Sequence, residues 1–320
     1  MITRRALPLI ATPAFLATPA LAQSARPIRM IIPFPPGGAT DALSRMAANK
    51  LQEKLGVTVV ADNRAGGNGV VGTMALLQAP NDGLTIMGSA SIHVMLHRVL
   101  RSLPFDPVTD LTPIARTARG PLLFVIHPRR QERSVTEVIE AARRNPQDWS
   151  MTTSSLGAAG HLAAIAFNQA AGTDILIVPQ RSSAAGLIDV AAGNVGLMFD
   201  PVLAPLPMVQ GGQLRALAIT NETRIAAVPD VPTMAEAGLP NFVFHSWYGV
   251  WGPRGMPVET VTRMNAALNE GFAEPDITAR LSQLAFQAVA ESAADFGRYI
   301  EADVARNTAL LRSVSFQPEG

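Results

Sequence analysis

A proline- and glycine-rich segment, Pro33 to Asp41, is the part of the sequence best suited to holding an anion. It follows a short apolar run and precedes apolar residues that recur every three or four positions, which predicts a strand, a tight turn and a helix. The first turn of a helix has free backbone N–H groups and the positive end of the helix dipole, which attract anions. Gly37 and Gly38 have no side chain that would keep a ligand from the backbone. The alternative is an ordinary turn capped by Thr40 or Asp41.

A second set of reactive side chains comprises Ser154, Ser155, His161 and Asp200, which could be taken for a hydrolase triad. The serines do not lie in the Gly-x-Ser-x-Gly turn that exposes a nucleophile, so we expect no enzyme. Hydroxyl and imidazole groups beside a helix start are better suited to binding a carboxylate. For His161, capping or packing remains the alternative.

The sequence gives little support for metal or nucleotide chemistry. His93 and His97 have the i, i+4 spacing of metal ligands, but Val94 stands where a zincin has glutamate. The chain has no cysteine, and the glycine-rich loop Asn63–Gly69 lacks the lysine of a P-loop. We therefore expect no metal and no cofactor.

Charge and composition limit the partners and the location. The 320 residues are 48% hydrophobic and contain 26 basic and 25 acidic side chains, a balance that disfavours nucleic acid as a partner. Residues 1–22 are typical of a signal peptide, with two arginines, a mostly apolar stretch and the cleavage site Ala20-Leu21-Ala22. A membrane anchor is the alternative, but three prolines interrupt the apolar stretch. We expect cleavage after Ala22 and a periplasmic protein; Sec and twin-arginine export both remain open.

The predicted elements must bring these residues together. Strands at 57–60 and 84–87 alternate with helices at 39–55 and 70–78, which predicts βαβ units and a parallel sheet. Ligands lie at the carboxyl ends of such strands. The loops Pro35–Thr40, Asn63–Gly69 and Ser89–Ser91 should therefore share one rim, which makes Ser89 a candidate ligand residue.

A second α/β series begins at the apolar strand 122–126 and ends at a return strand, 214–219. The chain should therefore form two lobes, residues 26–120 with 221–320 and residues 121–220, each a mainly parallel sheet flanked by helices. Such lobes close on a ligand about a hinge, here near 120–123 and 218–221. The tryptophans at 247 and 251 should lie in the core.

The chain resembles the Bug family of extracytoplasmic solute receptors, the binding proteins of tripartite tricarboxylate transporters. The segments that carry the resemblance are Pro33–Asp41, Asn63-Arg64, Asp82–Thr85, Leu103–Pro107, Asp110–Ile114, Met198–Asp200, Val231–Pro240 and Trp247–Gly249. The resemblance implies a type II-like periplasmic-binding-protein fold and a small carboxylate held by the loop after the first strand. The ligand-binding residues that it implies are Phe34, Gly37, Gly38, Ala39, Thr40 and Asp41 on one side and Ser154, Ser155, His161 and Asp200 on the other.

The sequence departs from the family pattern at two sites. The usual Asn-Arg-Pro-Gly-Ala-Gly-Gly is Asn63-Arg64-Ala-Gly-Gly-Asn-Gly69, and the usual Pro-Tyr-Lys-Gly is Pro-Gln180-Arg181-Ser. The second departure falls where the far end of a ligand would lie, so Gln180 and Arg181 are expected to set specificity. Arginine can grip a second carboxylate with two hydrogen bonds, which favours a dicarboxylate; a solvent-facing Arg181 is the alternative. For Arg64 we expect a surface ion pair.

The sequence thus predicts an exported, monomeric receptor that captures a small organic anion and passes it to the membrane subunits of a transporter. A ligand-gated sensor subunit for a signalling partner is the second hypothesis, and a periplasmic hydrolase the third.

Overall fold

The computed structural model describes residues 26–319, so the predicted signal peptide, residues 1–22, lies outside the described residues. The strands are β1 (Ile28–Ile32), β2 (Val59–Asn63), β3 (Thr85–Ala90), β4 (Leu111–Ile126), β5 (Ser150–Thr153), β6 (Leu176–Pro179), β7 (Leu197–Pro201), β8 (Arg215–Ile219), β9 (His245–Pro253) and β10 (Gln287–Ala288). The helices are α1 (Ala39–Leu55), α2 (Val70–Leu77), α3 (Ile92–Val99), α4 (Val135–Arg144), α5 (Ala159–Ala171), α6 (Ser183–Ala192), α7 (Leu206–Gln210), α8 (Val258–Phe272), α9 (Pro275–Gln283) and α10 (Ala293–Ser313). Two 3₁₀ turns, Gly67–Gly69 and Pro146–Asp148, complete the set.

Local sequence signals fix several of the helix ends. Glycines in the left-handed conformation end α1 at Gly56, α5 at Gly172 and α6 at Gly193. At the start of α4, the Ser134 side chain accepts a hydrogen bond from the Glu137 amide, which is one of the two hydrogen bonds of a Ser-x-x-Glu capping box.

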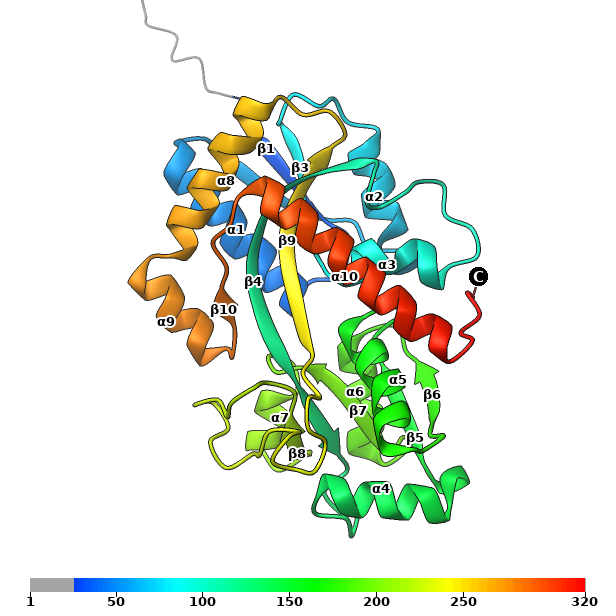
Figure 1. The fold of residues 1–320 in the computed structure, drawn as a ribbon. Helices are drawn as coiled ribbons and strands as arrows, with labels where there is room; N and C mark the ends of the chain where they lie inside the picture. The colour runs from blue at the N-terminus through cyan, green and yellow to red at the C-terminus, as the bar shows by residue number, and fades with distance from the viewer. Residues whose placement is uncertain (1–25, 320) are drawn as a thin grey trace, which may run out of the picture.

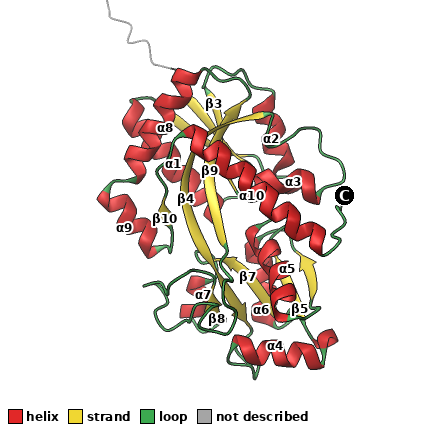
Figure 2. Cartoon of the chain, in the orientation of Figure 1, coloured by secondary structure: helices red, strands yellow, loops and turns green. Residues whose placement is uncertain are grey.

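Two parallel three-stranded units are joined through long antiparallel strands (Figures 1 and 2). The strand order is β2-β1-β3-β9-β4-β7-β5-β6, with β8 and β10 also paired to β4. Strands β1, β2 and β3 are parallel, as are β5, β6 and β7. Strand β4 is shared: its first part pairs with β9 and its last part, Leu122–Ile126, pairs with β7. This is the predicted α/β, two-lobed class.

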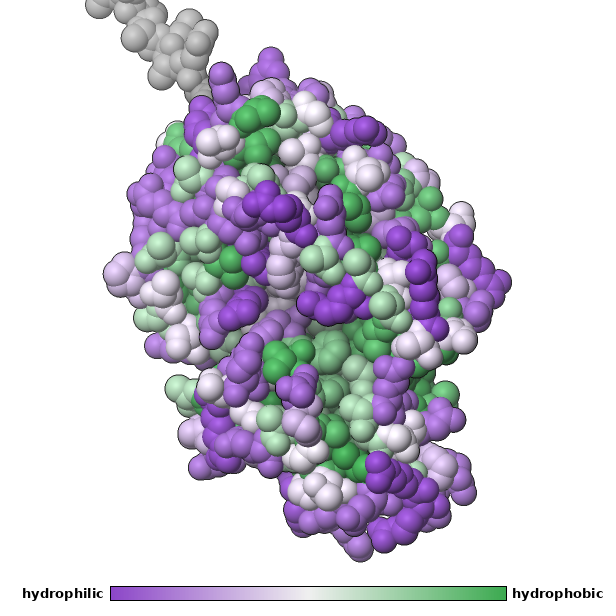
Figure 3. Space-filling view, in the orientation of Figure 1, coloured by the Kyte–Doolittle hydropathy of each residue, from purple (hydrophilic) through white to green (hydrophobic). Residues whose placement is uncertain are grey.

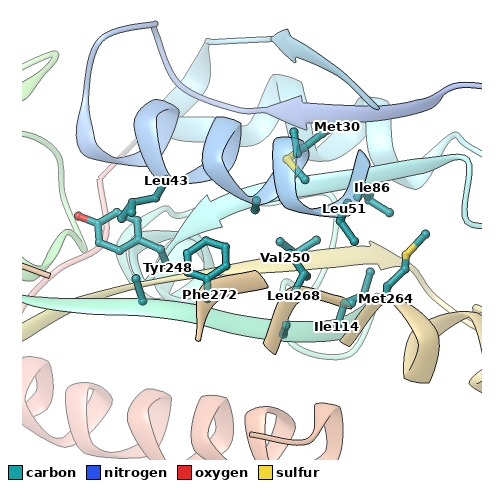
Figure 4. Close-up of a cluster of buried hydrophobic side chains, with 14 of the residues drawn as sticks. Met30, Leu43, Leu51, Ile86, Ile114, Tyr248, Val250, Met264, Leu268 and Phe272 are labelled. Carbon is teal, nitrogen blue, oxygen red and sulfur yellow. The ribbon is translucent and has the colours of Figure 1, made fainter. Parts of the chain in front are cut away.

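Helices cover both faces of each sheet. In the first lobe, α1 and α8 enclose an apolar cluster that contains Leu43, Val250 and Phe272, and Figure 4 shows Tyr248 at its edge with the hydroxyl pointing away from the cluster. On the other face, α10 crosses in front of β4 and β9. The two tryptophans that we expected in the core are there, each 1% exposed.

An irregular segment, residues 221–244, connects β8 to β9. Residues 221–244 have no long helix or strand, but Met234, Leu239 and Phe242 pack in the cluster built around Phe124. The Phe244 amide, directly before β9, donates to the Thr220 carbonyl at 3.1 Å. Among residues 26–319, no helix has the length and apolar character needed to cross a membrane.

Candidate functional site

A cavity of about 530 Å³ lies between the two lobes. Space-filling Figure 3 shows apolar side chains gathered where the lobes meet, while polar side chains cover much of the outer surface. Eight of the predicted site residues line the cavity: Phe34, Gly37, Gly38, Ala39, Thr40, Ser154, Ser155 and Arg181. A cavity of this size is typical of a site for a small molecule.

At the start of α1, the first-lobe wall of the cavity presents backbone groups. Gly38 caps α1 with an extended conformation (φ −86°, ψ 174°), and no side chain accepts from the amides of the first turn. Gly37 has φ +91°, a left-handed conformation that favours glycine. A Cβ at Gly38 would meet nothing within 4 Å, so the space in front of it is open.

Asp41 lies behind this wall and does not line the cavity. Its carboxylate accepts hydrogen bonds from the Gly37 amide (3.1 Å), Arg45 Nε (2.9 Å) and Asn63 Nδ2 (2.9 Å). Burial opposes the charged form, but these hydrogen bonds outweigh it and lower the pKa of Asp41. Asp41 therefore holds the Pro/Gly turn in place as a carboxylate.

The second-lobe wall adds two more helix N-termini. Ala158, Ala159 and Gly160 at the start of α5 line the cavity, and α5 has no side-chain cap. At the start of α6, Ser182, Ser183 and Ala184 line it too. Ser182 accepts from the Ala185 amide, which leaves the Ser183 and Ala184 amides facing the site without a helical acceptor. With Ser91 and Ile92 at the start of α3 in the first lobe, four helix N-termini meet at one cavity, an arrangement that favours anions.

Arg181 is the one charged side chain among the residues that line this cavity in the described structure. It is exposed, and within residues 26–319 it takes part in no ion pair or side-chain hydrogen bond that would hold it elsewhere. Its predicted neighbour Gln180 does not line the cavity; the Gln180 amide nitrogen Nε2 donates to Asp189 Oδ2 at 2.6 Å.

Asp200 is buried beneath the α6 terminus, 1% exposed, and reaches the cavity only through Ser183. The Ser183 hydroxyl donates to Asp200 Oδ1 at 2.9 Å, while Oδ2 has no partner among the described residues. Burial raises the pKa of Asp200 to about 7, although the hydrogen bond from Ser183 opposes this.

His161 and Ser89, both predicted as ligand residues, lie outside the cavity lining in the described structure. His161 is 2% exposed, and its Nδ1 accepts from the Gly157 amide at 3.0 Å, so it supports the turn after Ser155. Burial lowers the pKa of His161 to about 4, which makes it neutral. Ser89 is buried within β3.

The serine, histidine and aspartate of the second lobe do not have the geometry of a triad. His161 contacts the Gly157 amide, and the Asp200 carboxyl accepts from Ser183 rather than from the imidazole. A triad requires the base to contact the nucleophile and the carboxylate to contact the base.

A hydrogen bond near the cavity connects a loop of the first lobe with a loop of the second. Asn68, in a left-handed conformation (φ 56°), donates from Nδ2 to the Leu156 carbonyl at 3.2 Å. Leu156 follows the lining residues Ser154 and Ser155. Arg64, on the same loop, forms the expected surface ion pair with Asp62 at 2.9 Å.

Ser91 lines the cavity, as expected for the rim loop Ser89–Ser91. Other lining residues were not predicted from the sequence: Ile92, Ser182, Ser183, Ser246 and Tyr248 are the most informative. Ser182 and Ser183 stand at the start of α6, and a serine directly before an apolar helical pattern is a typical N-cap, so a capping rule would have found them. Ser246 and Tyr248 come from β9, whose antiparallel pairing with β3 and β4 gives no local signal.

Two α/β lobes around a cavity lined by helix N-termini define a solute-binding protein. The model of the tripartite tricarboxylate transporter family receptor matches residues 43–316, so the chain belongs to this family. The family consists of solute receptors, and the predicted resemblance to Bug proteins is confirmed.

Relatives and solved structures agree with this assignment. The chain is 37% identical over 260 residues to the UPF0065 protein in the tcbD-tcbE intergenic region of Pseudomonas sp. (strain P51), covering 81% of this chain and 77% of that protein. It is 36% identical over 251 residues to protein BugT of Bordetella pertussis, covering 78% and 77%. Among solved structures, R. palustris Rpa4515 with adipate has a TM-score of 0.87 at 33% identity, covering 93% of this chain and all of that one. The periplasmic binding protein BugD has a TM-score of 0.83 at 27% identity, covering 92% and 99%.

Proposed function

We propose that this chain is an exported, periplasmic receptor that captures a small organic anion between its lobes and delivers it to the membrane subunits of a tripartite tricarboxylate-type transporter. It acts as a monomer by capture and closure, without catalysis. The observation that carries the proposal is the meeting of the α1, α3, α5 and α6 N-termini at one cavity. Free amides and helix dipoles at that point favour a carboxylate over a neutral or cationic ligand. Family membership and the adipate-bound neighbour support the same ligand class.

The ligand that we favour is a dicarboxylate with an apolar spacer. One carboxylate would lie at the α1 terminus, and Arg181 with the α6 terminus would hold the other. Phe34, Ile92, Ala158 and Ala204 offer apolar surface between these ends. Arg181→Ala should weaken adipate binding more than binding of a monocarboxylate, while Arg64→Ala, a matched surface change, should alter neither. Equal losses for both acids would exclude Arg181 from specificity.

Closure would take place about the two segments that cross between the lobes, β4 near Gly120–Leu123 and the start of β9. We propose residues 26–120 with 245–319 as one lobe and 121–244 as the other, because residues 228–242 pack with the second lobe. Small-angle scattering should show a smaller radius of gyration with saturating ligand, and an unchanged radius would count against closure.

A thermal-shift screen tests the function itself. Organic mono-, di- and tricarboxylates should raise the unfolding temperature, whereas adipamide, the neutral counterpart of adipate, should not. Native mass spectrometry of protein purified from cells identifies an endogenous ligand independently. If no carboxylate stabilises the protein and neutral compounds do, the proposed ligand class is wrong.

A further inference from the structure

The Asp200–Ser183 pair forms a polar unit between the core of the second lobe and the cavity. Ser183 is the first residue of α6 and lines the cavity, whereas Asp200, on β7, lies behind it. Their hydrogen bond is 2.9 Å long. A serine hydroxyl has a single proton, so it can donate to Asp200 or to a ligand, but not fully to both.

The state of Asp200 therefore decides what Ser183 offers to the cavity. When Asp200 is ionised, it is purely an acceptor and takes the Ser183 proton, so that Ser183 presents lone pairs to the ligand. When Asp200 is protonated, it can donate to Ser183 Oγ and free the serine proton for an anion. We propose that Asp200 is a positioning residue whose protonation turns the Ser183 hydroxyl toward the ligand, so that the receptor takes up a proton together with its anion. This inference rests on the proposed function.

The surroundings of Asp200 leave its negative charge poorly supported. Its carboxyl is almost fully buried, its Oδ2 has no partner among the described residues, and no basic side chain of residues 26–319 forms an ion pair with it. Its neighbour across β4 is the apolar Leu123. From β9, the titratable group that faces it is Tyr248, whose pKa is raised by burial and further by the charge of Asp200. Burial is accordingly the main reason that the pKa of Asp200 rises to about 7.

A bound anion should itself favour protonation of Asp200. The α6 N-terminus is the local feature that favours a negative charge on Asp200, and an anion bound there would compete for it. Two negative charges at one terminus disfavour each other, so binding should raise the proton affinity of Asp200 further. Arg181, the charged lining residue, has no ion pair with Asp200 and is free to face the ligand in the described structure.

The first test measures Asp200 without ligand. Carboxyl carbon shifts in NMR, assigned by comparison with Asp200→Asn, should give a midpoint near neutral pH for wild type. Ser183→Ala should raise that midpoint, because it removes the hydrogen bond that supports the ionised form. A midpoint below about 5, the range of an ordinary aspartate, would overturn the inference whatever the protein binds.

The second test measures adipate affinity by calorimetry between pH 6 and pH 9. Wild type should lose affinity as pH rises, approaching tenfold per unit above the midpoint, and should take up protons in buffers of different ionisation enthalpy. Asp200→Asn, whose amide donates to Ser183 at every pH, should bind without this slope and more than about tenfold more tightly than wild type at pH 9. A flat wild-type profile would overturn the proton coupling and leave the receptor function intact. Failure of carboxylates to bind would overturn the receptor function, and the unliganded titration would still decide the state of Asp200.

Discussion

Each wall of the cavity has an aspartate behind a helix N-terminus, Asp41 behind α1 and Asp200 behind α6. Both are buried, at 6% and 1% exposure. Asp41 receives hydrogen bonds from a backbone amide, an arginine and an asparagine, which together lower its pKa. Asp200 receives one hydrogen bond, from Ser183, and its pKa rises to about 7. Burial favours the neutral form of both groups; the three donors at Asp41 outweigh it, whereas the single donor at Asp200 does not.

The two walls also differ in the groups that they present to a ligand. The first-lobe wall presents backbone amides behind glycines, which suit a carboxylate of any acid. The second-lobe wall presents serine hydroxyls and Arg181, which respond to the length and chemistry of the ligand. We therefore expect the first wall to determine that an anion binds, and the second to determine which anion binds.

Replacing Asp200 should produce the largest change. Because its folded-state pKa exceeds the usual value for an unfolded aspartate, its contribution to stability is full below about pH 4 and is lost as pH rises through 7. Between pH 5 and pH 8, the free energy of unfolding of wild type should fall relative to that of Asp200→Asn by about 3 kcal/mol, because about two pH units separate pH 5 from the folded-state pKa. Urea unfolding at the two pH values measures this. Parallel changes in the two proteins would show that Asp200 is ionised normally.

Replacing Asp41 should give the opposite pH dependence. Its lowered pKa means that its contribution to stability is present above about pH 4 and is lost as pH falls through the folded-state value. Asp41→Ala leaves the Gly37 amide and Asn63 Nδ2 without this acceptor, so we expect a loss of about 2–3 kcal/mol at pH 7. Urea unfolding with Glu53→Ala as a surface control measures it, and a loss below about 0.5 kcal/mol would argue against a structural role.

The third prediction separates backbone from side chain in the first wall. Gly38→Val puts a branched side chain into open space before the α1 amides, without a strained φ angle. We expect it to weaken anion binding by about 1–3 kcal/mol more than Thr40→Val does, because buried groups would lose their partners. Calorimetry with adipate decides, provided that both variants unfold at the wild-type temperature. Unchanged affinity of Gly38→Val would show that the ligand does not approach this wall.

The smallest expected effect concerns the contact between the walls. Asn68→Ala removes the hydrogen bond to the Leu156 carbonyl, which connects the rims of the two lobes. If this bond stabilises the closed form, ligand dissociation should accelerate by a few-fold, in line with about 1 kcal/mol for one hydrogen bond. Stopped-flow dissociation measures the rate, with Asn81→Ala, which loses a contact within the first lobe, as control. Equal rates for the two variants would place the Asn68 contact outside the closure equilibrium.

The sequence was most informative where structure is local. The α1 start at Ala39 follows from a Pro/Gly turn beside a regular apolar period, and both signals lie within one short segment. The pair of Asp200 with Ser183 could not be predicted, because it depends on how β7 and α6 lie in the folded lobe. The packing of residues 221–244 against the second lobe had no periodic signal either, since a few apolar residues such as Met234 and Phe242 anchor an irregular segment. The family resemblance placed His161 in the binding site, but in the fold its imidazole accepts a hydrogen bond from the Gly157 amide and does not line the cavity.

A crystal structure of the protein with adipate tests the central claim most directly. We predict one carboxylate within hydrogen-bonding distance, about 3 Å, of the Ala39 and Thr40 amides, and the other near Arg181 and Ser183. Adipate bound outside the interlobe cavity, or inside it with no carboxylate at the α1 N-terminus, would contradict this account.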